Sequence, residues 1–285
     1  MTRPTARLRE LLRSGRMVVA PFVWDGFGAK AAERAGCHAV YMTGFGTAAA
    51  RGFPDVGLLT MTEMVQNAAY IAAAVDLPVI ADADTAYGNP INTHRTVREY
   101  ERAGVAAIHI EDQVWPKKCG FMEGKRVIPA EEMAEKVKAA LAARTDPDFV
   151  IIARTDAYAP LGWDEAVRRA RLYRESGADL IFVDGIHTHD DLRRYAVDLA
   201  GIPRLYNGGL LPAGEIESLG FAVQIAGGTL AAVHDAFARA FTELMEHGTI
   251  TPALHDPRFD FDGLTDLLGL PAIREMERRF AITEP

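Results

Sequence analysis

The chain has 285 residues, of which 49% are hydrophobic and 25% are charged, a composition typical of folded globular proteins and not of disordered ones. Its formal net charge of -8 leaves no excess of lysine and arginine, so nucleic acid is not an expected partner. Apolar runs such as residues 17–24 are shorter than the roughly 20 residues that span a bilayer. An anionic substrate would therefore need a local cluster of positive charge or a metal ion.

The N-terminal residues and the cysteines indicate where the protein is located. Basic residues at Arg3, Arg7 and Arg9 are not followed by an apolar stretch, which is unlike a signal peptide. The two cysteines, Cys37 and Cys119, are too few for a disulfide framework and suit a reducing compartment. We therefore expect a cytoplasmic protein that does not bind membranes.

Eight short apolar runs alternate along the chain with segments that carry apolar residues at helical spacing. The predicted strands are residues 18–21, 39–43, 79–83, 107–110, 149–153, 180–183, 203–206 and 222–225. Helices are predicted between them, for example over 131–141 and 163–173. Several of these helices end at a glycine just before the next run, as at Gly36 and Gly104. Eight such units predict the α/β class and a closed (β/α)8 TIM barrel.

The chain from about residue 230 is predicted to be helical, with helices over 232–244 and 263–280 joined by the Pro- and Asp-bearing stretch 251–262. The last helix carries more apolar surface than a terminal helix usually leaves in water. Its apolar residues are Leu267, Leu268, Leu270, Ile273, Met276 and Phe280. We expect one barrel domain over 1–285, with a C-terminal helical extension over about 230–285 that packs on the barrel or on a neighbouring subunit.

Acidic residues follow two neighbouring predicted strands, at the end of the barrel where active sites form. Asp82 and Asp84 close the third strand and are two apart, so both should point to one face, and Glu111 closes the fourth. Three carboxylates together would repel one another unless a hard cation lay between them, and oxygen ligands suit Mg2+ or Mn2+. The alternative is that these acids cap helices or lie on the surface.

The loop after the fourth strand places Lys117 and Lys118 beside Cys119. Nearby positive charge lowers the pKa of a thiol, so that it can give or take a proton near neutral pH. The alternative is a buried inert thiol, which is how we interpret Cys37. Arg154 follows the fifth strand and could bind a substrate carboxylate through two hydrogen bonds or serve as a structural ion-pair partner.

Six segments, in order along nearly the whole barrel, resemble the isocitrate lyase and phosphoenolpyruvate mutase superfamily. They are Tyr41-Met42-Thr43-Gly44, Pro54-Asp55-Val56-Gly57, Asp82-Ala83-Asp84-Thr85-Ala86-Tyr87-Gly88-Asn89, Glu111-Asp112-Gln113, Lys117-Lys118-Cys119-Gly120 and Ile152-Ala153-Arg154-Thr155-Asp156. Each segment is weak alone, but together they are specific. The lysine-cysteine-glycine segment marks the C–C lyase branch, which includes methylisocitrate and dimethylmalate lyases.

The resemblance implies a Mg2+-dependent barrel, in which Mn2+ could replace Mg2+, and usually a homotetramer whose C-terminal helix packs on a neighbouring subunit. The implied metal site consists of Asp55, Asp82, Asp84 and Glu111. The implied substrate-binding residues are Tyr41, Thr43, Gly44, Phe45, Arg154 and Asn207. The implied catalytic residues are Cys119, as acid or base on the carbon that is cleaved off, and its neighbours Lys117 and Lys118.

Three positions depart from the pattern of related lyases. The histidine that usually follows the cysteine-glycine pair is Phe121 here, the loop after the seventh strand keeps Asn207 but lacks an acid, and Asp184 stands where glutamate is common. The first two changes make the far end of the substrate site more apolar, so Phe121 is a further candidate for binding substrate, and methyl groups of the substrate could rest against Phe121 and Leu210. His187 and His189 could suggest a zinc site, but the sequence around them is typical of a helix start.

These residues predict a Mg2+-dependent lyase that cleaves a C–C bond of a small 2-hydroxy di- or tricarboxylate, similar to an alkyl-substituted malate, by retro-aldol chemistry. Cys119 would protonate the departing carbon. Isocitrate should be a poor substrate, because its charged end would face Phe121 without a partner. The alternatives are an oxaloacetate-type 2-oxo-acid decarboxylase, a C–P bond enzyme on the same scaffold, and a non-catalytic barrel that binds a metal or ligand.

Overall fold

The computed structural model describes residues 2–120, 122–254 and 260–281. Its strands are β1 Val18–Val23, β2 Val40–Met42, β3 Val79–Asp82, β4 Ala107–Glu111, β5 Val150–Thr155, β6 Leu180–Val183, β7 Arg204–Asn207 and β8 Val223–Ala226. All are parallel, each pairs with the next, and β8 pairs with β1 to close the barrel. The predicted (β/α)8 barrel is confirmed.

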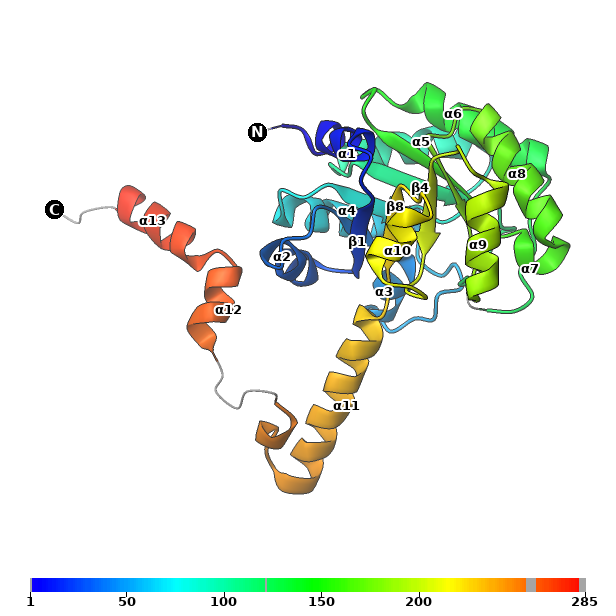
Figure 1. The fold of residues 1–285 in the computed structure, drawn as a ribbon. Helices are drawn as coiled ribbons and strands as arrows, with labels where there is room; N and C mark the ends of the chain where they lie inside the picture. Colours follow the sequence, from blue (N-terminus) through cyan, green and yellow to red (C-terminus); the bar gives the residue numbers. More distant parts are fainter. Residues whose placement is uncertain (1, 121, 255–259, 282–285) are drawn as a thin grey trace. The chain divides into compact units, whose positions relative to one another are not determined.

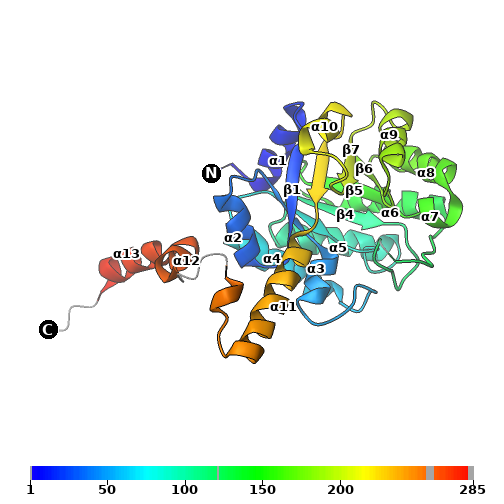
Figure 2. The ribbon, with the colours of Figure 1, turned by 60° about the horizontal axis from the view of Figure 1, so that its bottom comes forward.

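Helices surround the strands, as Figures 1 and 2 show. They are α1 Pro4–Arg13, α2 Gly26–Arg34, α3 Gly44–Ala49, α4 Met61–Ala74, α5 Pro90–Arg102, α6 Ala130–Ala143, α7 Tyr158–Leu161, α8 Trp163–Glu175, α9 His189–Asp198 and α10 Ala213–Ser218. Some of these helices start with a side-chain cap; at α9, for example, the Thr188 side chain accepts a hydrogen bond from the Asp191 N–H at 3.1 Å. The interpretation of His189 as part of a helix start is therefore confirmed.

Side chains of the strands alternate between the barrel interior and the helix layer. The interior is a solid apolar core, and Leu8 of α1 joins it. Its strand residues are Val18, Ala20, Tyr41, Ile80, Ala107, Val150, Ile152, Leu180, Phe182, Leu205, Val223 and Ile225. A second apolar cluster lies between the strands and the helices. Since the interior is filled, a substrate site can form only where the strands end.

Strand register brings polar residues to one level at the C-terminal end of the barrel. Asp82 of β3 stands opposite His109 of β4, and Glu111 of β4 stands opposite Arg154 of β5. Because the strands are parallel, all four residues lie at the same end. The register thus builds the floor of a polar site.

The segment after β3 departs from the predicted geometry. β3 ends at Asp82, and Asp84, Ala86 and Tyr87 adopt left-handed backbone angles, with φ of 47°, 57° and 56°. Strand alternation therefore does not decide where Asp84 points, because Asp84 lies in a left-handed turn beyond the end of the strand. That Asp82 and Asp84 point to one face stays a prediction. The buried ammonium group of Lys136, on α6, donates a hydrogen bond to the carbonyl of Thr85 in this turn.

The chain divides into two compact units, Met1–Gly227 and Gly228–Pro285. The second contains α11 Thr229–His247, the 3-10 turn η1 Thr251–Ala253, α12 Phe261–Leu267 and α13 Leu270–Phe280. The prediction of one helix over 263–280 is wrong, because Gly269 has a φ of 88° and Pro271 cannot donate a backbone hydrogen bond. Residues 255–259 of the predicted connecting stretch lie outside the described residues.

The helices of the second unit carry exposed apolar side chains. Phe237 and Phe241 stack on α11 with ring centroids 5.7 Å apart, and Ile273, Met276 and Phe280 of α13 are also exposed. Across the described part of the chain, no helix combines the length and the hydropathy needed to cross a membrane.

Candidate active site

Buried charged side chains gather where β3, β4 and β5 end. Asp55, Asp82, Asp84 and Glu111 are each no more than 6% exposed. Lys117, from the loop after β4, forms an ion pair with Asp55 and places its Nζ 3.0 Å from Oδ1 of Asp84. Burial alone would lower the pKa of Lys117, but the surrounding acids, led by Asp84, raise it well above its ordinary value. Lys117 is therefore a fixed positive charge among the acids.

Asp82 is held by two backbone N–H groups. Oδ2 accepts a hydrogen bond from Gly44 at 3.2 Å, and Oδ1 accepts one from Asp84 at 2.9 Å. A side chain at position 44 would put its Cβ 2.4 Å from Oδ2 of Asp82, so this approach requires glycine. Burial favours the neutral acid, but His109 and Lys117 outweigh burial and lower the pKa of Asp82.

The pKa values of Asp84 and Glu111 shift the other way. Burial raises the pKa of Asp84 to about 6, and nearby Asp82 adds to this effect. Burial also raises the pKa of Glu111 well above its ordinary value, although Nε of Arg154 lies 3.3 Å from Oε2. Oε1 of Glu111 is buried and has no hydrogen-bond partner among the described residues. The nearby cations therefore do not offset the cost of burying these two acids, and without a further positive charge their neutral forms are favoured.

The predicted cluster of three carboxylates around a metal ion does not form from side chains alone. In residues 2–120, 122–254 and 260–281, no group of three or more His, Cys, Asp or Glu side chains is arranged to hold a metal ion. The physical reason is that the cationic groups of Lys117 and Arg154 lie against the acids. The oxygen donors, the raised pKa values and the partnerless Oε1 of Glu111 nevertheless fit a divalent cation that takes further ligands from a bound molecule or water.

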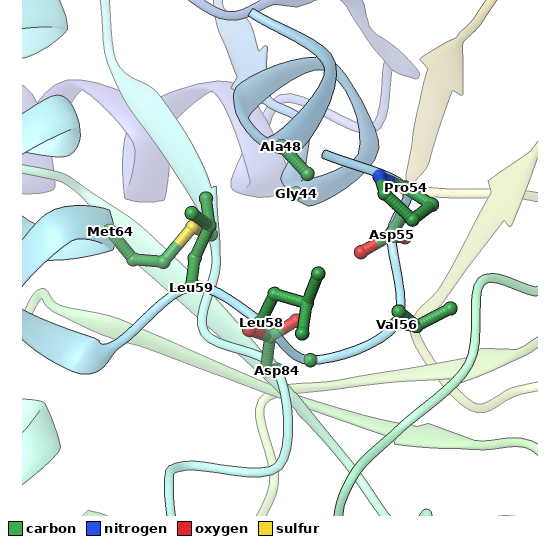
Figure 3. Close-up of a pocket in the computed structure, with 10 residues that line it drawn as sticks. Gly44, Ala48, Pro54, Asp55, Val56, Leu58, Leu59, Met64 and Asp84 are labelled. Atoms are coloured by element: carbon green, nitrogen blue, oxygen red, sulfur yellow. The ribbon is translucent and has the colours of Figure 1, made fainter. Parts of the chain in front are cut away.

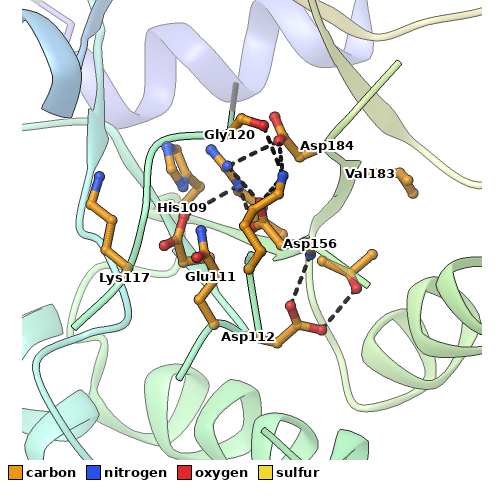
Figure 4. A network of polar contacts seen from close by, with 12 residues as sticks. His109, Glu111, Asp112, Lys117, Gly120, Asp156, Val183 and Asp184 are labelled. Atoms are coloured by element: carbon orange, nitrogen blue, oxygen red, sulfur yellow. Dashed lines mark hydrogen bonds and ion pairs between the residues drawn. The ribbon is translucent and has the colours of Figure 1, made fainter. Parts of the chain in front are cut away.

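Besides Glu111 of β4, Arg154 pairs with acids that follow β5 and β6. Its Nε and Nη2 donate to Oδ2 and Oδ1 of Asp156 at 2.8 and 2.9 Å, and Nη2 lies 3.2 Å from Oδ2 of Asp184. Figure 4 shows this network with Asp156 and Asp184 labelled. Although burial opposes the charge, Arg154 holds the pKa of Asp156 far below its usual value. The ion-pair role left open by the sequence is thus present, and a role in binding substrate stays a prediction.

The loop that carries Cys119 is fixed through its backbone. The Cys119 N–H donates to the carbonyl of Asp55 at 3.0 Å, and the thiol side chain is buried. The Gln113 side chain donates to the Lys118 carbonyl at 2.8 Å and accepts from the Lys118 N–H at 3.0 Å. The exposed ammonium group of Lys118 donates to the Glu123 carbonyl at 3.2 Å. The ammonium groups of Lys117 and Lys118 thus bind Asp55, Asp84 and the Glu123 carbonyl. That they lower the pKa of Cys119 stays a prediction.

Cys37 differs from its sequence interpretation in one respect. It is half-buried and not fully buried, and it packs against the apolar cluster between the strands and the helices. Burial raises the pKa of its thiol, which fits an inert thiol.

Tyr41 and Thr43, at the end of β2, contact other residues of the protein. The buried Tyr41 hydroxyl lies 2.6 Å from Nε2 of His109 and 3.5 Å from Oδ2 of Asp82. Thr43 accepts a hydrogen bond from Gly46 at 3.2 Å and so caps α3. Their predicted contacts with substrate remain predictions.

The other predicted substrate residues differ in their exposure. Phe45 is exposed, Asn207 ends β7 and is half-buried, and Leu210 packs against the outer apolar cluster. Phe121 lies outside the described residues. Its predicted contact with substrate therefore stays a prediction.

A small cavity lies beside Asp55 and Asp84 (Figure 3). Its volume of about 10 Å3 has room for about one water molecule. Most of the other lining side chains are apolar, and they are Ala48, Pro54, Val56, Leu58, Leu59 and Met64. A dicarboxylate is larger than this cavity, so its binding here requires the lining to move.

Two residues of the site were not found by the sequence analysis. His109 faces the barrel interior, where burial lowers its pKa to about 4, so the imidazole is neutral at pH 7. Lys125 is a buried lysine whose Nζ lies 3.0 Å from Oδ1 of Asp156 and 3.1 Å from Oδ2 of Asp184. His109 could have been inferred from its strand register, but a loop lysine carries no periodic signal.

Comparisons with known proteins identify the family of this chain. The profile of the family described as Phosphoenolpyruvate phosphomutase matches residues 8–245. The chain belongs to the phosphoenolpyruvate mutase and isocitrate lyase superfamily, which confirms the resemblance of its motifs. Within that superfamily it is similar to the 2,3-dimethylmalate lyase of Eubacterium barkeri, with 46% identity over 283 residues that cover 97% of this chain and 98% of that protein.

Two solved structures are similar over the whole chain. The structure of oxaloacetate acetylhydrolase in complex with the inhibitor 3,3-difluorooxalacetate has a TM-score of 0.92 and 34% identity, and each chain is covered completely. The structure of phosphonopyruvate hydrolase in complex with oxalate and Mg2+ has a TM-score of 0.90 and 32% identity, covering 99% of this chain and 100% of that one.

Proposed function

We propose that this protein is a Mg2+-dependent lyase that cleaves a C–C bond in a small 2-hydroxy di- or tricarboxylate, most suitably an alkyl-substituted malate. The observation that carries the proposal is the buried acid cluster beside Cys119, in a chain 46% identical to a 2,3-dimethylmalate lyase over nearly its full length. The acids of this cluster outnumber its cations, so an anionic substrate requires additional positive charge.

Asp82, Asp84 and Glu111 would hold the divalent cation, with Asp55 beside them. When bound, Mg2+ supplies positive charge that attracts a substrate carboxylate and stabilises negative charge on the neighbouring oxygen. Glu111 contributes the oxygen that has no partner among the described residues, Oε1. The similar phosphonopyruvate hydrolase binds Mg2+ together with oxalate, a dicarboxylate, which supports this assignment.

The chain's own cations and amides would orient the substrate. Lys117 keeps a fixed charge next to Asp84, and Arg154 lies at the level of Glu111 across the strand pair. Thr43, Gly44 and Phe45 form the start of α3 and would surround one substrate carboxylate. These groups place the C2–C3 bond of the substrate over the acids.

Cleavage requires a base and an acid. The 2-hydroxyl proton passes to a buried carboxylate of the cluster, the C2–C3 bond breaks, and C2 becomes a carbonyl carbon. The electron pair of the broken bond remains on the other fragment as an enolate, and the thiol of Cys119 protonates its carbon. Cys119 suits this role because its backbone is fixed to Asp55, a residue of the acid cluster.

The apolar surroundings support an alkyl-substituted substrate. Leu58, Leu59 and Met64 line the cavity beside Asp84, and Leu210 belongs to the loop after β7. One methylene in an apolar pocket changes kcat/KM by about 10-fold or more. Phe121 would add to this surface.

The experiment is a comparison of kcat/KM for 2,3-dimethylmalate, other alkyl malates, 2-methylisocitrate, isocitrate and oxaloacetate, with Mg2+ present. We expect an alkyl malate to exceed isocitrate by at least about tenfold. A preference for isocitrate by the same factor would contradict the role of Phe121, and decarboxylation of oxaloacetate alone would favour the decarboxylase alternative. Loss of phosphate from a phosphonate substrate would indicate a C–P bond enzyme, and no turnover of any acid would indicate a binding protein.

The same proposal includes location and assembly. A cytoplasmic enzyme would keep the Cys119 thiol reduced. A homotetramer would cover the apolar side chains of α11 and α13 that are exposed in the single chain.

A further inference from the structure

Lys125 belongs to the loop between β4 and α6, and its ammonium group is buried. The side chain is 2% exposed, and a lysine buried to this degree needs compensating partners. Its Nζ donates to the Gly120 carbonyl at 2.9 Å, to Oδ1 of Asp156 at 3.0 Å and to Oδ2 of Asp184 at 3.1 Å. Three partners match the three donors of an ammonium group.

These partners belong to different parts of the barrel. Gly120 is the residue after Cys119, Asp156 follows β5, and Asp184 follows β6. The ammonium group therefore joins the segment that carries the thiol to two strand ends of the rigid barrel. Figure 4 shows Gly120 next to Asp184.

The approach of Gly120 to Asp184 is very close. A Cβ built at position 120 would lie 2.3 Å from Oδ2 of Asp184 and 2.9 Å from its Cγ. No side chain fits in this gap, so the backbone of residue 120 lies directly against the carboxylate. Two independent features, the ion pairs of Lys125 and the lack of a side chain at Gly120, thus hold the same contact.

We propose that Lys125 is a positioning residue: its ammonium group fastens the backbone beside Cys119 to Asp156 and Asp184 and so sets the place of the thiol over the acid cluster. The inference rests on the proposed function only for the role of that thiol. Lys117 and Lys118 cannot do this work, because Lys117 binds Asp55 and Asp84 and Lys118 binds the exposed carbonyl of Glu123.

The test measures the position of Cys119 without any substrate. In a Cys37→Ser background, Cys119 is the only thiol of the chain, and its alkylation by iodoacetamide can be followed by mass spectrometry. Lys125→Met should raise the alkylation rate at least about tenfold, because the buried Cys119 side chain loses its fixed place. Lys138→Met is the matched control, since Lys138 pairs only on the surface of α6 with Glu135 among the contacts described, and its rate should stay within twofold.

Hydrogen exchange separates a local effect from general loss of structure. In Lys125→Met the amide of Cys119, which donates to Asp55, should exchange at least about tenfold faster, while amides of β3 and β5 keep their wild-type rates. Equal alkylation and exchange rates in Lys125→Met and wild type would overturn the proposal. Faster exchange in every strand would overturn it as well, because Lys125 would then be a general structural residue.

A second variant covers the case in which Lys125→Met does not fold. Gly120→Ala keeps Lys125 but pushes residue 120 away from Asp184, and it should raise the alkylation rate by a similar factor. An unchanged rate in Gly120→Ala would overturn the proposal.

If the wild type cleaves an alkyl malate, Lys125→Met should lower kcat at least about tenfold and change KM less, because the thiol acts on the departing carbon and not on binding. A change in KM alone would overturn the positioning role. If the wild type cleaves none of the acids, the proposed function fails, but the alkylation and exchange measurements still decide the role of Lys125.

Discussion

Asp84→Asn tests the electrostatics of the acid cluster with little change of shape. Asparagine tolerates the left-handed backbone at this position, where φ is 47°, as well as aspartate does. The pKa of Asp84 is about 6 in the folded protein against an ordinary 3.8, and one pKa unit corresponds to about 1.4 kcal/mol. Ionised Asp84 therefore destabilises the metal-free fold by about 3 kcal/mol at most.

The sign of the pH dependence follows from these two values. Well below pH 3.8 Asp84 is protonated in both the folded and the unfolded state, and well above pH 6 it is ionised in both. In between, the unfolded state releases its proton first, so the free energy of unfolding falls as pH rises. Asparagine lacks this decline, and the variant should be more stable than wild type at pH 7.5 by about 1 to 3 kcal/mol. The range extends below 3 kcal/mol because the substitution also removes one of the two acid partners of Lys117, which lowers the gain in stability.

The assay is urea unfolding followed by circular dichroism at pH 4 and pH 7.5 in EDTA. Glu135→Gln is the control, because Glu135 is 61% exposed on α6 and its change should stay within about 0.5 kcal/mol at both pH values. Added Mg2+ should stabilise wild type and not Asp84→Asn. A variant less stable than wild type at pH 7.5, or a difference that is the same at both pH values, would refute the reasoning.

Three further predictions concern the thiol, the metal and the assembly. Cys119→Ser should fold normally and lose at least about 100-fold in kcat, because a serine hydroxyl is a far weaker acid than a thiol; Cys37→Ser should keep wild-type kcat, and a Cys119→Ser variant near wild type would make Cys119 structural. EDTA should abolish turnover and Mg2+ or Mn2+ restore it, because without the metal the negative charge that develops on the substrate oxygen lacks its cationic partner. Full activity in a metal-free sample would contradict the assignment of the acids. Light scattering should report a tetramer, because Phe237, Phe241 and Ile273 are exposed in the single chain, and a monomer at micromolar concentration is the contrary result.

The strands were predictable because a buried parallel strand is an unbroken apolar run. The run 180–183 matches β6 at both ends. The predicted runs at β4 and β5 stop too early, since the strands continue through Glu111, Arg154 and Thr155. The last residues of these two strands are polar residues of the site that still pair with a neighbouring strand. The apolar run in the sequence therefore ends before the strand does.

The partners of the site residues could not be predicted in the same way. Position along a strand shows that Asp82 and Glu111 lie at one end of the barrel, but a loop has no period that fixes where Lys117 points. Its contact with Asp55 joins residues 62 positions apart. The left-handed turn at Asp84 is likewise invisible to strand alternation, because it depends on tertiary contacts that hold an unfavourable backbone.

That turn also fixes the backbone that carries Asp84 before any substrate arrives. Left-handed angles at Asp84, Ala86 and Tyr87 are unfavourable by about 1 kcal/mol or more each, and they persist only because neighbours such as Lys136 hold the turn through the Thr85 carbonyl. The carboxylate is thus preorganised: its orientation was fixed when the chain folded, and binding need not supply that ordering. A mutation at Lys136, on a helix of the outer ring, can therefore weaken the acid cluster by releasing the turn that carries Asp84.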